Sequence, residues 1–220
     1  MSETPIQDYL HTQGLKLPKE DVYTAYLAAA SVIQSGQAEI ERGILWYEQP
    51  ENKLTDYFAD NEKNHAVLKQ IFMALDSSWT RTAAPICSAT VYAALPEQKK
   101  LVRLAQQGWP LEQALPLTEE AAGLYLASRT AQSGWLNLAE DIRHWLEQGD
   151  LAGGRNLRDG SQMSLPICLD NGRVLGVIHL ESRQKNAFGE ASQAVWVALA
   201  LALAEPLRIL LEIPAEGQPE

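Results

Sequence analysis

The sequence has few of the residues that hold metals or disulfides, and those it has are scattered. Two cysteines and four histidines occur in 220 residues, and none shows CxxC, HxxxH or HExxH spacing. Residues 149–155 are rich in glycine but lack the Gly-Lys-Ser/Thr ending of a phosphate-binding loop. We therefore expect no metal site, no disulfide framework and no cofactor.

Basic residues and long apolar runs are also scarce. The 18 lysines and arginines face 28 acidic residues, and the net charge of −10 opposes attraction to nucleic acids and anionic lipids. The longest apolar run, residues 194–204, is well short of the roughly 20 residues that cross a bilayer. No charged-then-apolar leader opens the chain. We expect a cytoplasmic protein with no membrane span and no direct nucleic-acid partner.

What the chain does contain is typical of a globular protein with a helical extension. Hydrophobic residues make up 46% of it and charged residues 21%. Apolar residues recur at helical spacing over residues 19–47, and Gly36 and Gly43 could mark a break in that helix or allow a close contact with another helix. We divide the chain into an N-terminal helical extension (1–62), a main domain (63–213) and a disordered tail (214–220), with a connector at 48–62.

The last third of the chain predicts a β-hairpin. Residues 161–169 and 173–182 read as strands around Asp170-Asn171-Gly172, and an Asn-Gly pair favours a two-residue type I′ turn. That turn fixes the register and, with it, which side chains share a face of the sheet. The less apolar face is expected to carry Ser164, Pro166, Cys168, Leu175, Val177, His179 and Glu181.

These residues resemble the closing hairpin of a GAF domain. The resemblance rests on Ser164-Leu165-Pro166-Ile167, the turn, Arg173-Val174-Leu175-Gly176-Val177-Ile178 and Phe188. Upstream, a helix at 64–79, strands at 86–95 and 100–107, a helical middle at 117–146 and the glycine-rich loop follow the family's order. The resemblance implies an α+β fold: an antiparallel sheet with helices on one face, a pocket covered by loops and helices on the other, and N-terminal helices outside it.

In that arrangement the glycine-rich loop before the hairpin lies near the ligand pocket. Arg155 and Arg158 project from it, and guanidinium groups are suited to capture a carboxylate or phosphate. We therefore expect the loop to be a lid and both arginines to bind an anionic ligand. The alternative is two solvated arginines on a surface loop.

Five further residues are predicted to contact the ligand. His179, with Ser164 and Glu181 beside it, could form a pocket wall, or it could be a partly buried histidine bonded to a neighbour such as Ser164. Trp135 could be an aromatic wall or a core residue. Asp141 could contact the ligand or be a first-turn helix acid.

The resemblance also sets limits on activity. Members that reduce free methionine sulfoxide resemble one another in a mid-domain cysteine cluster, and residues 117–158 contain no cysteine. Cys87 and Cys168 read as small core residues. Neither is followed by the histidine of a bilin-binding site, and Asn186, Phe188 and Glu190 match only fragments of a cyclic-nucleotide signature. We expect no enzymatic activity.

Two functions of different class remain open. The first is a bacterial-type signalling domain in which a small molecule orders the lid and shifts the terminal helices. The second is a ligand-free interaction module with a collapsed pocket, whose helices form a homodimer or dock on a signalling partner. In both, the apolar helices at the two ends of the chain favour a homodimer built from them.

Overall fold

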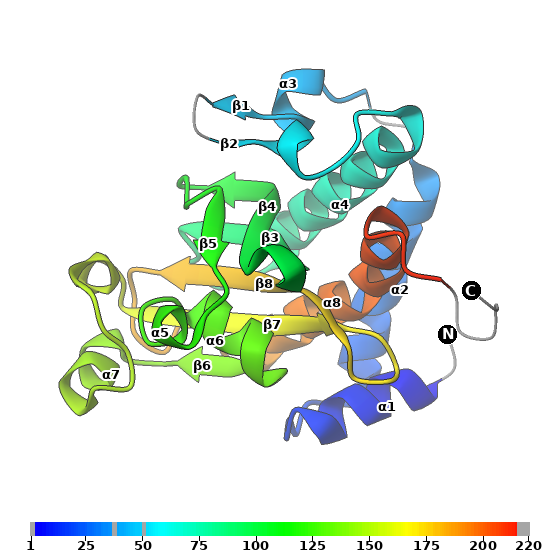
Figure 1. Ribbon diagram of the computed structural model, residues 1–220. Helices are drawn as coiled ribbons and strands as arrows, with labels where there is room; N and C mark the ends of the chain where they lie inside the picture. The colour runs from blue at the N-terminus through cyan, green and yellow to red at the C-terminus, as the bar shows by residue number, and fades with distance from the viewer. Residues whose placement is uncertain (1–2, 37–38, 50–51, 215–220) are drawn as a thin grey trace.

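The computed structural model describes residues 3–36, 39–49 and 52–214, and it has a β-sheet between two layers of helices (Figure 1). In this part of the chain, six antiparallel strands form one sheet in the order β5-β4-β3-β8-β7-β6. The strands are β3 (Ser88–Leu95), β4 (Lys100–Gly108), β5 (Ala114–Pro116), β6 (Asn137–Ala139), β7 (Ser161–Cys168) and β8 (Val174–Ser182). A short 3-10 turn, η2 (Pro96–Gln98), links β3 to β4.

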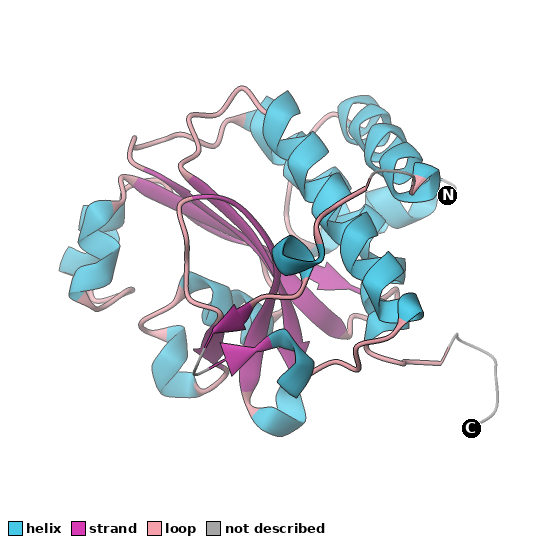
Figure 2. Ribbon diagram, turned by 90° about the horizontal axis from the view of Figure 1, so that it is seen from above, coloured by secondary structure: helices cyan, strands magenta, loops and turns pink. Residues whose placement is uncertain are grey.

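Three long helices cover one face of the sheet, as Figure 2 shows from above. They are α2 (Lys19–Ser35), α4 (Glu62–Arg81) and α8 (Glu190–Leu210). Helices α8 and α4 pack side by side on the sheet, and α2 packs against both of them, so both apolar faces of α8 are covered within the chain. The main core lies here, and it includes Leu68, Ile71, Leu165, Ile178, Leu180, Trp196, Leu199 and Leu203, all 0% exposed.

Short helices lie on the opposite side of the sheet, and the second of them packs on β7 and β8 near its centre. They are α5 (Glu119–Ala122), α6 (Leu126–Ser133), α7 (Ile142–Gln148) and the 3-10 segment η3 (Gly154–Arg158). Thr118 caps α5 by accepting a hydrogen bond from Ala121 N. The expectation of a wholly helical middle was wrong, because edge strand β6 interrupts it and pairs with β7.

The N-terminal region shares the main core. Helix α1 (Glu3–Thr12) was not predicted, and its Ile6 is almost fully buried. Helix α2 ends at Gly36, whose left-handed φ of 52° suits glycine, so this is where the predicted helix breaks. Beyond it come α3 (Arg42–Leu45), the small hairpin of β1 (Glu48–Gln49) and β2 (Asn52–Lys53), and η1 (Leu54–Asp56). The domain boundary near residue 62 stays a prediction, and residues 215–220 of the predicted tail lie outside the described residues.

The β7–β8 hairpin forms as predicted in its middle but not at its turn. Pro166 lies opposite Val177 and Ser164 opposite His179. The loop, however, has three residues: Leu169 N donates to Arg173 O, and only Gly172 has a positive φ, at 83°. This is the pattern of a type I turn followed by a left-handed glycine, and a register shift at Ile167/Cys168 places Cys168 opposite Val174 instead of Leu175.

Helix α8 is long and apolar enough to cross a membrane by length and composition alone. Of its most apolar window, 61% is buried inside the protein. A helix that is apolar all round and covered on both sides is the pattern of a core helix. Its apolarity is therefore accounted for by packing within the fold.

Candidate functional site

The candidate site lies where the sheet face opposite α8 meets α6 and η3. Strand pairing places Gln162 opposite Glu181, and His179 opposite both Ser164 and Thr90. All five of these side chains are buried, so this face of the sheet is polar at its centre. We call α6 and η3, together with the loops that lead into them, the cover of the site. A cavity of about 10 Å³ remains between the sheet and this cover. It is lined by Tyr92, Leu111, Leu115, Tyr125, Leu126, Ala127, Arg155, Asn156, Gln162, His179 and Glu181.

Glu181 is the central charge of the site. Its side chain is 3% exposed, and both carboxylate oxygens accept hydrogen bonds from Arg158 Nη2, at 3.1 and 2.9 Å. His179 Nε2 lies 3.4 Å from Glu181 Oε1. Burial by itself raises the pKa of Glu181, but His179, Arg158 and Arg155 together outweigh burial and lower it. Glu181 is therefore held as a carboxylate.

Arg155 closes the site from the side of the cover. Its Nη2 donates to Glu112 Oε2 at 2.7 Å and lies 3.9 Å from Glu181 Oε1. Its guanidinium carbon is 4.6 Å from the centroid of the Tyr125 ring, which is cation–π distance. The guanidinium thus sits among two carboxylates and one aromatic face.

A second buried acid lies beside Glu181. Asp159 is 6% exposed, and burial followed by the charge of Glu181 raises its pKa to about 6. Gln162 Nε2 donates to Asp159 Oδ2 at 2.8 Å, which partly offsets this. Asn156 Nδ2 donates to the carbonyl oxygens of Leu124 and Ala152. These two bonds connect η3 to the loop before α6 and to the residues directly before η3.

Several buried polar atoms around the cavity lack a hydrogen-bond partner among the residues that the structure describes. Three of them, His179 Nδ1, Gln162 Oε1 and Arg155 Nε, belong to residues that line the cavity, and the fourth, Thr90 Oγ1, is on the residue opposite His179 in the sheet. A buried polar group without a partner costs about 1–3 kcal/mol, so such groups are rarely left unpaired without a reason. Their concentration around one cavity marks a place where a polar molecule could bind.

The structure brings together five of the seven residues predicted from the sequence. Arg155, Arg158 and Glu181 are joined by ion pairs, and His179 and Ser164 are neighbours across β7 and β8. His179 contacts Glu181, whereas the Ser164 hydroxyl donates to Ile178 O. The neighbour that bonds His179 is therefore Glu181 and not Ser164, which the sequence had suggested. Both arginines are paired with carboxylates, but they differ in exposure: the Arg155 side chain is 23% exposed, whereas that of Arg158 is 41% exposed and remains partly solvated.

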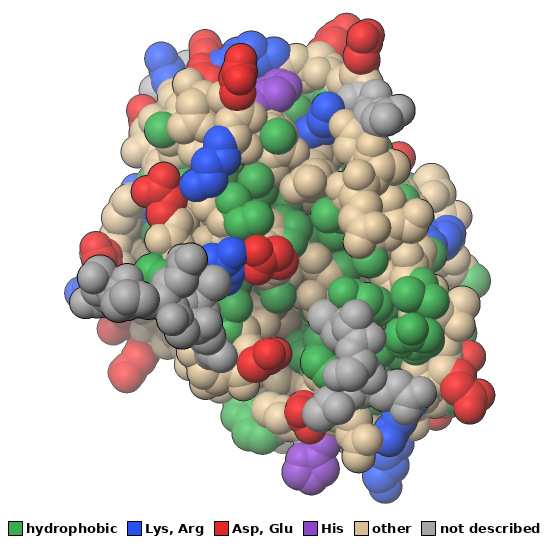
Figure 3. Space-filling model, turned by 90° about the vertical axis from the view of Figure 1, so that its right-hand side faces the viewer, with side chains coloured by type: hydrophobic (Ala, Val, Ile, Leu, Met, Phe, Trp, Pro, Cys, Tyr) green, Lys and Arg blue, Asp and Glu red, His purple; other side chains and the backbone are tan. Residues whose placement is uncertain are grey.

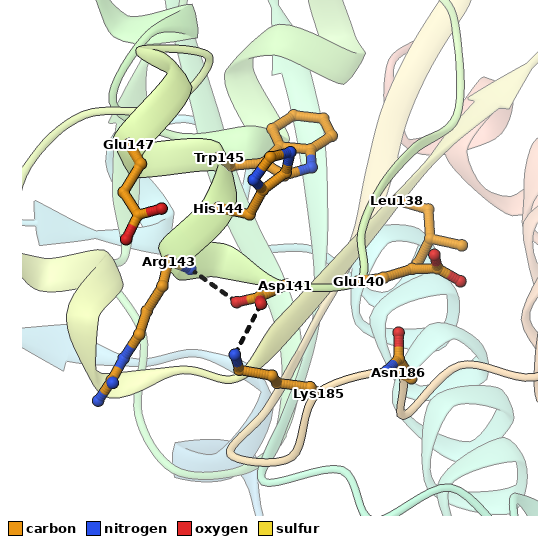
Figure 4. Close-up of a pocket in the computed structure, with 9 residues that line it drawn as sticks. All are labelled: Leu138, Glu140, Asp141, Arg143, His144, Trp145, Glu147, Lys185 and Asn186. Atoms are coloured by element: carbon orange, nitrogen blue, oxygen red, sulfur yellow. Dashed lines mark hydrogen bonds and ion pairs between the residues drawn. The ribbon is translucent and has the colours of Figure 1, made fainter.

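Trp135 and Asp141 lie elsewhere. The Trp135 side chain is 55% exposed between α6 and β6, so it is neither a core residue nor a wall of this cavity. Asp141 caps α7 by accepting from Arg143 N at 3.1 Å, and it pairs with Lys185 Nζ at 2.7 Å. It lines a different, open surface hollow of about 640 Å³ next to Trp145 and Glu140 (Figure 4).

Sequence reasoning missed several residues of the site. Gln162 could have been found by extending the hairpin register two residues beyond Ser164, because side chains alternate with a period of two. Glu112 and Tyr125 lie in separate loops and carry no such signal, since only folding brings them to Arg155. Asp159 lies between η3 and β7, outside any helix or strand, so no periodicity in the sequence indicates that it is buried.

Cys87, directly before β3, and Cys168, the last residue of β7, lie beside opposite ends of β8. Cys87 N bonds to Glu181 O, while Cys168 is opposite Val174, so roughly 20 Å of strand separates them at about 3.3 Å per residue. Burial raises the pKa of both thiols, that of Cys168 to about 11. Both are half-buried rather than fully in the core. Among the described residues, no group of His, Cys, Asp and Glu could hold a metal ion.

Comparison with known proteins gives matches to solved structures only. No protein-family model matches the chain, and no curated protein matches it in sequence. A GAF domain of an Acinetobacter phosphoenolpyruvate-protein phosphotransferase aligns over 86% of this chain and 96% of its own, with TM-score 0.57 and 13% identity. The GAF domain of the Coxiella burnetii enzyme of that name aligns over 83% and 92%, with TM-score 0.54 and 15% identity.

An enzyme has the same fold. A type II free methionine-R-sulfoxide reductase from Thermoplasma acidophilum aligns over 67% of this chain and 96% of its own, with TM-score 0.55 and 17% identity. At such identities the likeness concerns the fold and leaves the activity open. The sheet, the helices on its two faces and the covered polar site together give this chain the α+β fold of GAF domains.

Proposed function

We propose that the protein is a cytoplasmic regulatory domain that binds a small polar molecule between the sheet and the lid loop (residues 149–158). The observation that carries this proposal is the set of buried, unpartnered polar atoms around a closed cavity. A binding site of this kind combines an apolar enclosure with a few placed polar groups. Structures with the same fold include a putative GAF sensor protein from Burkholderia vietnamiensis and residues 122–287 of a methyl-accepting chemotaxis protein, and they support the proposal by analogy.

The cavity is closed in the conformation described. A volume of about 10 Å³ holds at most one water molecule, so any ligand must displace the lid loop. Gly149 and Gly153 have positive φ values of 79° and 90°, and a Cβ at Gly154 would meet no atom within 4 Å. Glycine lowers the barrier to backbone rearrangement, because it populates positive and negative φ alike. The lid loop can therefore open without moving the sheet.

A physical route connects the cover of the site to the N-terminal helices. Helix α6 lines the cavity and ends at Gly134. Gln13, directly after α1, donates through Nε2 to Gly134 O at 3.0 Å and accepts through Oε1 from Leu136 N at 2.6 Å. Tyr9 of α1 donates to Pro166 O of β7 at 2.9 Å. A ligand that moves α6 would therefore also displace α1, because Gln13 joins the two helices.

Native mass spectrometry of freshly purified protein tests this proposal, with the denatured mass of the same sample as the reference. A noncovalent excess mass, together with slower amide exchange in residues 149–158, is the expected result for a retained ligand. A protein that shows no excess mass and whose lid-loop exchange responds to no compound in a metabolite screen would overturn the proposal.

The second candidate is a ligand-free interaction module. The observation in its favour is that Arg155 and Arg158 already fill the site and bind its carboxylates. Its output would be a homodimer through the terminal helices, where Leu27 of α2 is 49% exposed. Figure 3 shows hydrophobic side chains grouped among charged ones on the face near the ends of the chain. Light scattering at micromolar concentration tests it, and a monomer would count against it.

Sulfoxide reduction is the enzymatic alternative that the shared fold raises. It needs a thiolate nucleophile and a resolving thiol close to the substrate. The separation of Cys87 and Cys168 along β8 and their raised pKa values do not favour that chemistry. Turnover of free methionine sulfoxide that disappears in a variant with both cysteines changed to serine would establish it.

A further inference from the structure

The guanidinium of Arg155 occupies a site that is built for a cation. Glu112 Oε2 lies 2.7 Å and Glu181 Oε1 3.9 Å from its Nη2, and the Tyr125 ring faces it at 4.6 Å. Two carboxylates and an aromatic face together attract a planar cation more strongly than any of them alone. We call these three residues, Glu112, Tyr125 and Glu181, the cation cage.

The cation that fills the cage belongs to the lid loop and not to the scaffold. Arg155 lies in η3, whereas the cage residues come from the β4–β5 connection, the start of α6 and strand β8. Gly153 and Gly154 directly precede Arg155. The lid loop can therefore withdraw the guanidinium while the three cage residues keep their positions.

Withdrawal of Arg155 would leave an excess of negative charge. The acidic side chains near the guanidinium are Glu112, Glu181 and Asp159. The basic ones that remain are Arg158, the His179 ring and Arg103, whose Nη1 donates to Leu111 O of the cavity wall, so the acidic groups still outnumber the arginines. Arg158 is already engaged by both oxygens of Glu181, so it does not neutralise Glu112. This charge balance disfavours the carboxylate or phosphate ligand expected from the sequence and favours a cation.

We propose that Arg155 is a built-in competitor, and that the ligand is a small molecule with a planar guanidinium-like or amidinium-like head that takes its place in the cation cage. This inference rests on the proposed ligand-binding function and specifies the ligand's chemistry. Binding the ligand exchanges one cation for another, so the carboxylates stay paired in both states. What changes is the position of the lid loop, which is bonded through Asn156 to Leu124 before α6, and this makes ligand binding a switch.

Chemical rescue of Arg155→Ala tests the cage without any need for the natural ligand. Methylguanidinium chloride at 20 mM is expected to raise the Tm of this variant by about 2–4 °C over sodium chloride of equal ionic strength. Wild-type protein, whose cage is filled, should shift by less than about 1 °C. Arg143→Ala, which removes an exposed arginine of α7, is the matched control and should behave like wild type.

A second variant tests the cage itself. In Arg155→Ala with Glu112→Gln, the affinity for methylguanidinium should fall about tenfold, because one of the two carboxylates is gone. If Arg155→Ala does not fold, Arg155→Met takes its place, since its unbranched stem still packs on Tyr125. Equal shifts in all variants, or no shift in Arg155→Ala, would overturn the inference. Neither outcome depends on whether wild-type protein retains a ligand, so the proposed function stands or falls separately.

Discussion

The Glu181 carboxylate and the Arg158 guanidinium form a two-point ion pair at the edge of a closed polar cavity. Glu181 is 3% exposed and Arg158 is 41% exposed, so one partner is buried and the other reaches water. The pair therefore fixes the end of η3 to strand β8, while the exposed side of the Arg158 guanidinium stays hydrated.

Changing Glu181 to Gln should lower the free energy of unfolding by about 1–2 kcal/mol. The loss stays below that of a fully buried pair, because water can solvate Arg158 once its partner is neutral. Urea denaturation measures it. Glu205→Gln is the matched control, since it breaks an exposed two-point pair with Arg208 and should cost no more than about 0.5 kcal/mol. Equal losses in the two variants would contradict this picture.

Asp159 should make the protein less stable as the pH rises from 4 to 7. Its pKa is about 6 in the folded protein against 3.8 for the unperturbed group, so folding favours the protonated form. This stabilising contribution is present below about pH 4 and is lost as the pH rises through 6. The total loss of stability is at most about 3 kcal/mol. The stability of wild type relative to Asp159→Asn, followed by urea denaturation across this range, should fall accordingly. A difference independent of pH would contradict the assignment.

Gly176→Ala should destabilise the protein by about 2 kcal/mol or more. A Cβ at this position would lie 2.2 Å from Tyr92 O and 2.6 Å from Leu207 Cδ2, so either β3 or α8 would have to move. Thermal denaturation measures the effect. Gly43→Ala is the matched control: a Cβ there meets nothing within 4 Å and the residue lies in helix α3, where alanine is favoured, so its Tm should not fall below that of wild type. A tolerated alanine at residue 176 would show that the packing of β8 on α8 is looser than described.

Gln13→Ala should free the loop after α6. It removes the acceptor for Leu136 N and the donor to Gly134 O, at a cost of about 1 kcal/mol. Hydrogen exchange at the Leu136 amide should become faster, with little change in the strands of the sheet. Gln34→Ala, at an exposed position of α2, provides the comparison. Unchanged exchange at Leu136 would remove the proposed link between α1 and the cover of the site.

Both thiols should react slowly with iodoacetamide at pH 7. Burial raises the pKa of Cys87 and brings that of Cys168 to about 11, so little thiolate is present in the folded protein. Mass spectrometry of labelled protein, with urea-unfolded protein as the reference, follows the reaction at each residue. Fast labelling of either cysteine in the folded state would reopen the question of thiol chemistry.

The part of the site that could be predicted from the sequence is the part with a local pattern. Side chains of a strand alternate with a period of two, so the hairpin by itself places Ser164, His179 and Glu181 on one face. Glycines before Arg155 likewise mark a loop. The turn was wrong in detail because Asn-Gly is compatible with both two-residue and three-residue loops, and only the register shift at Cys168 separates them.

The tertiary structure alone decided what these residues touch. Arg155 meets Glu112 from 43 positions earlier in the chain, and Gln13 binds Gly134 from 121 positions away. Such contacts leave no periodic trace in a sequence, because they depend on how separate elements pack and not on the path of one element. The alternation of the strands thus determined a polar sheet face, while the packing of the cover determined that its arginines are bound by the protein's own carboxylates.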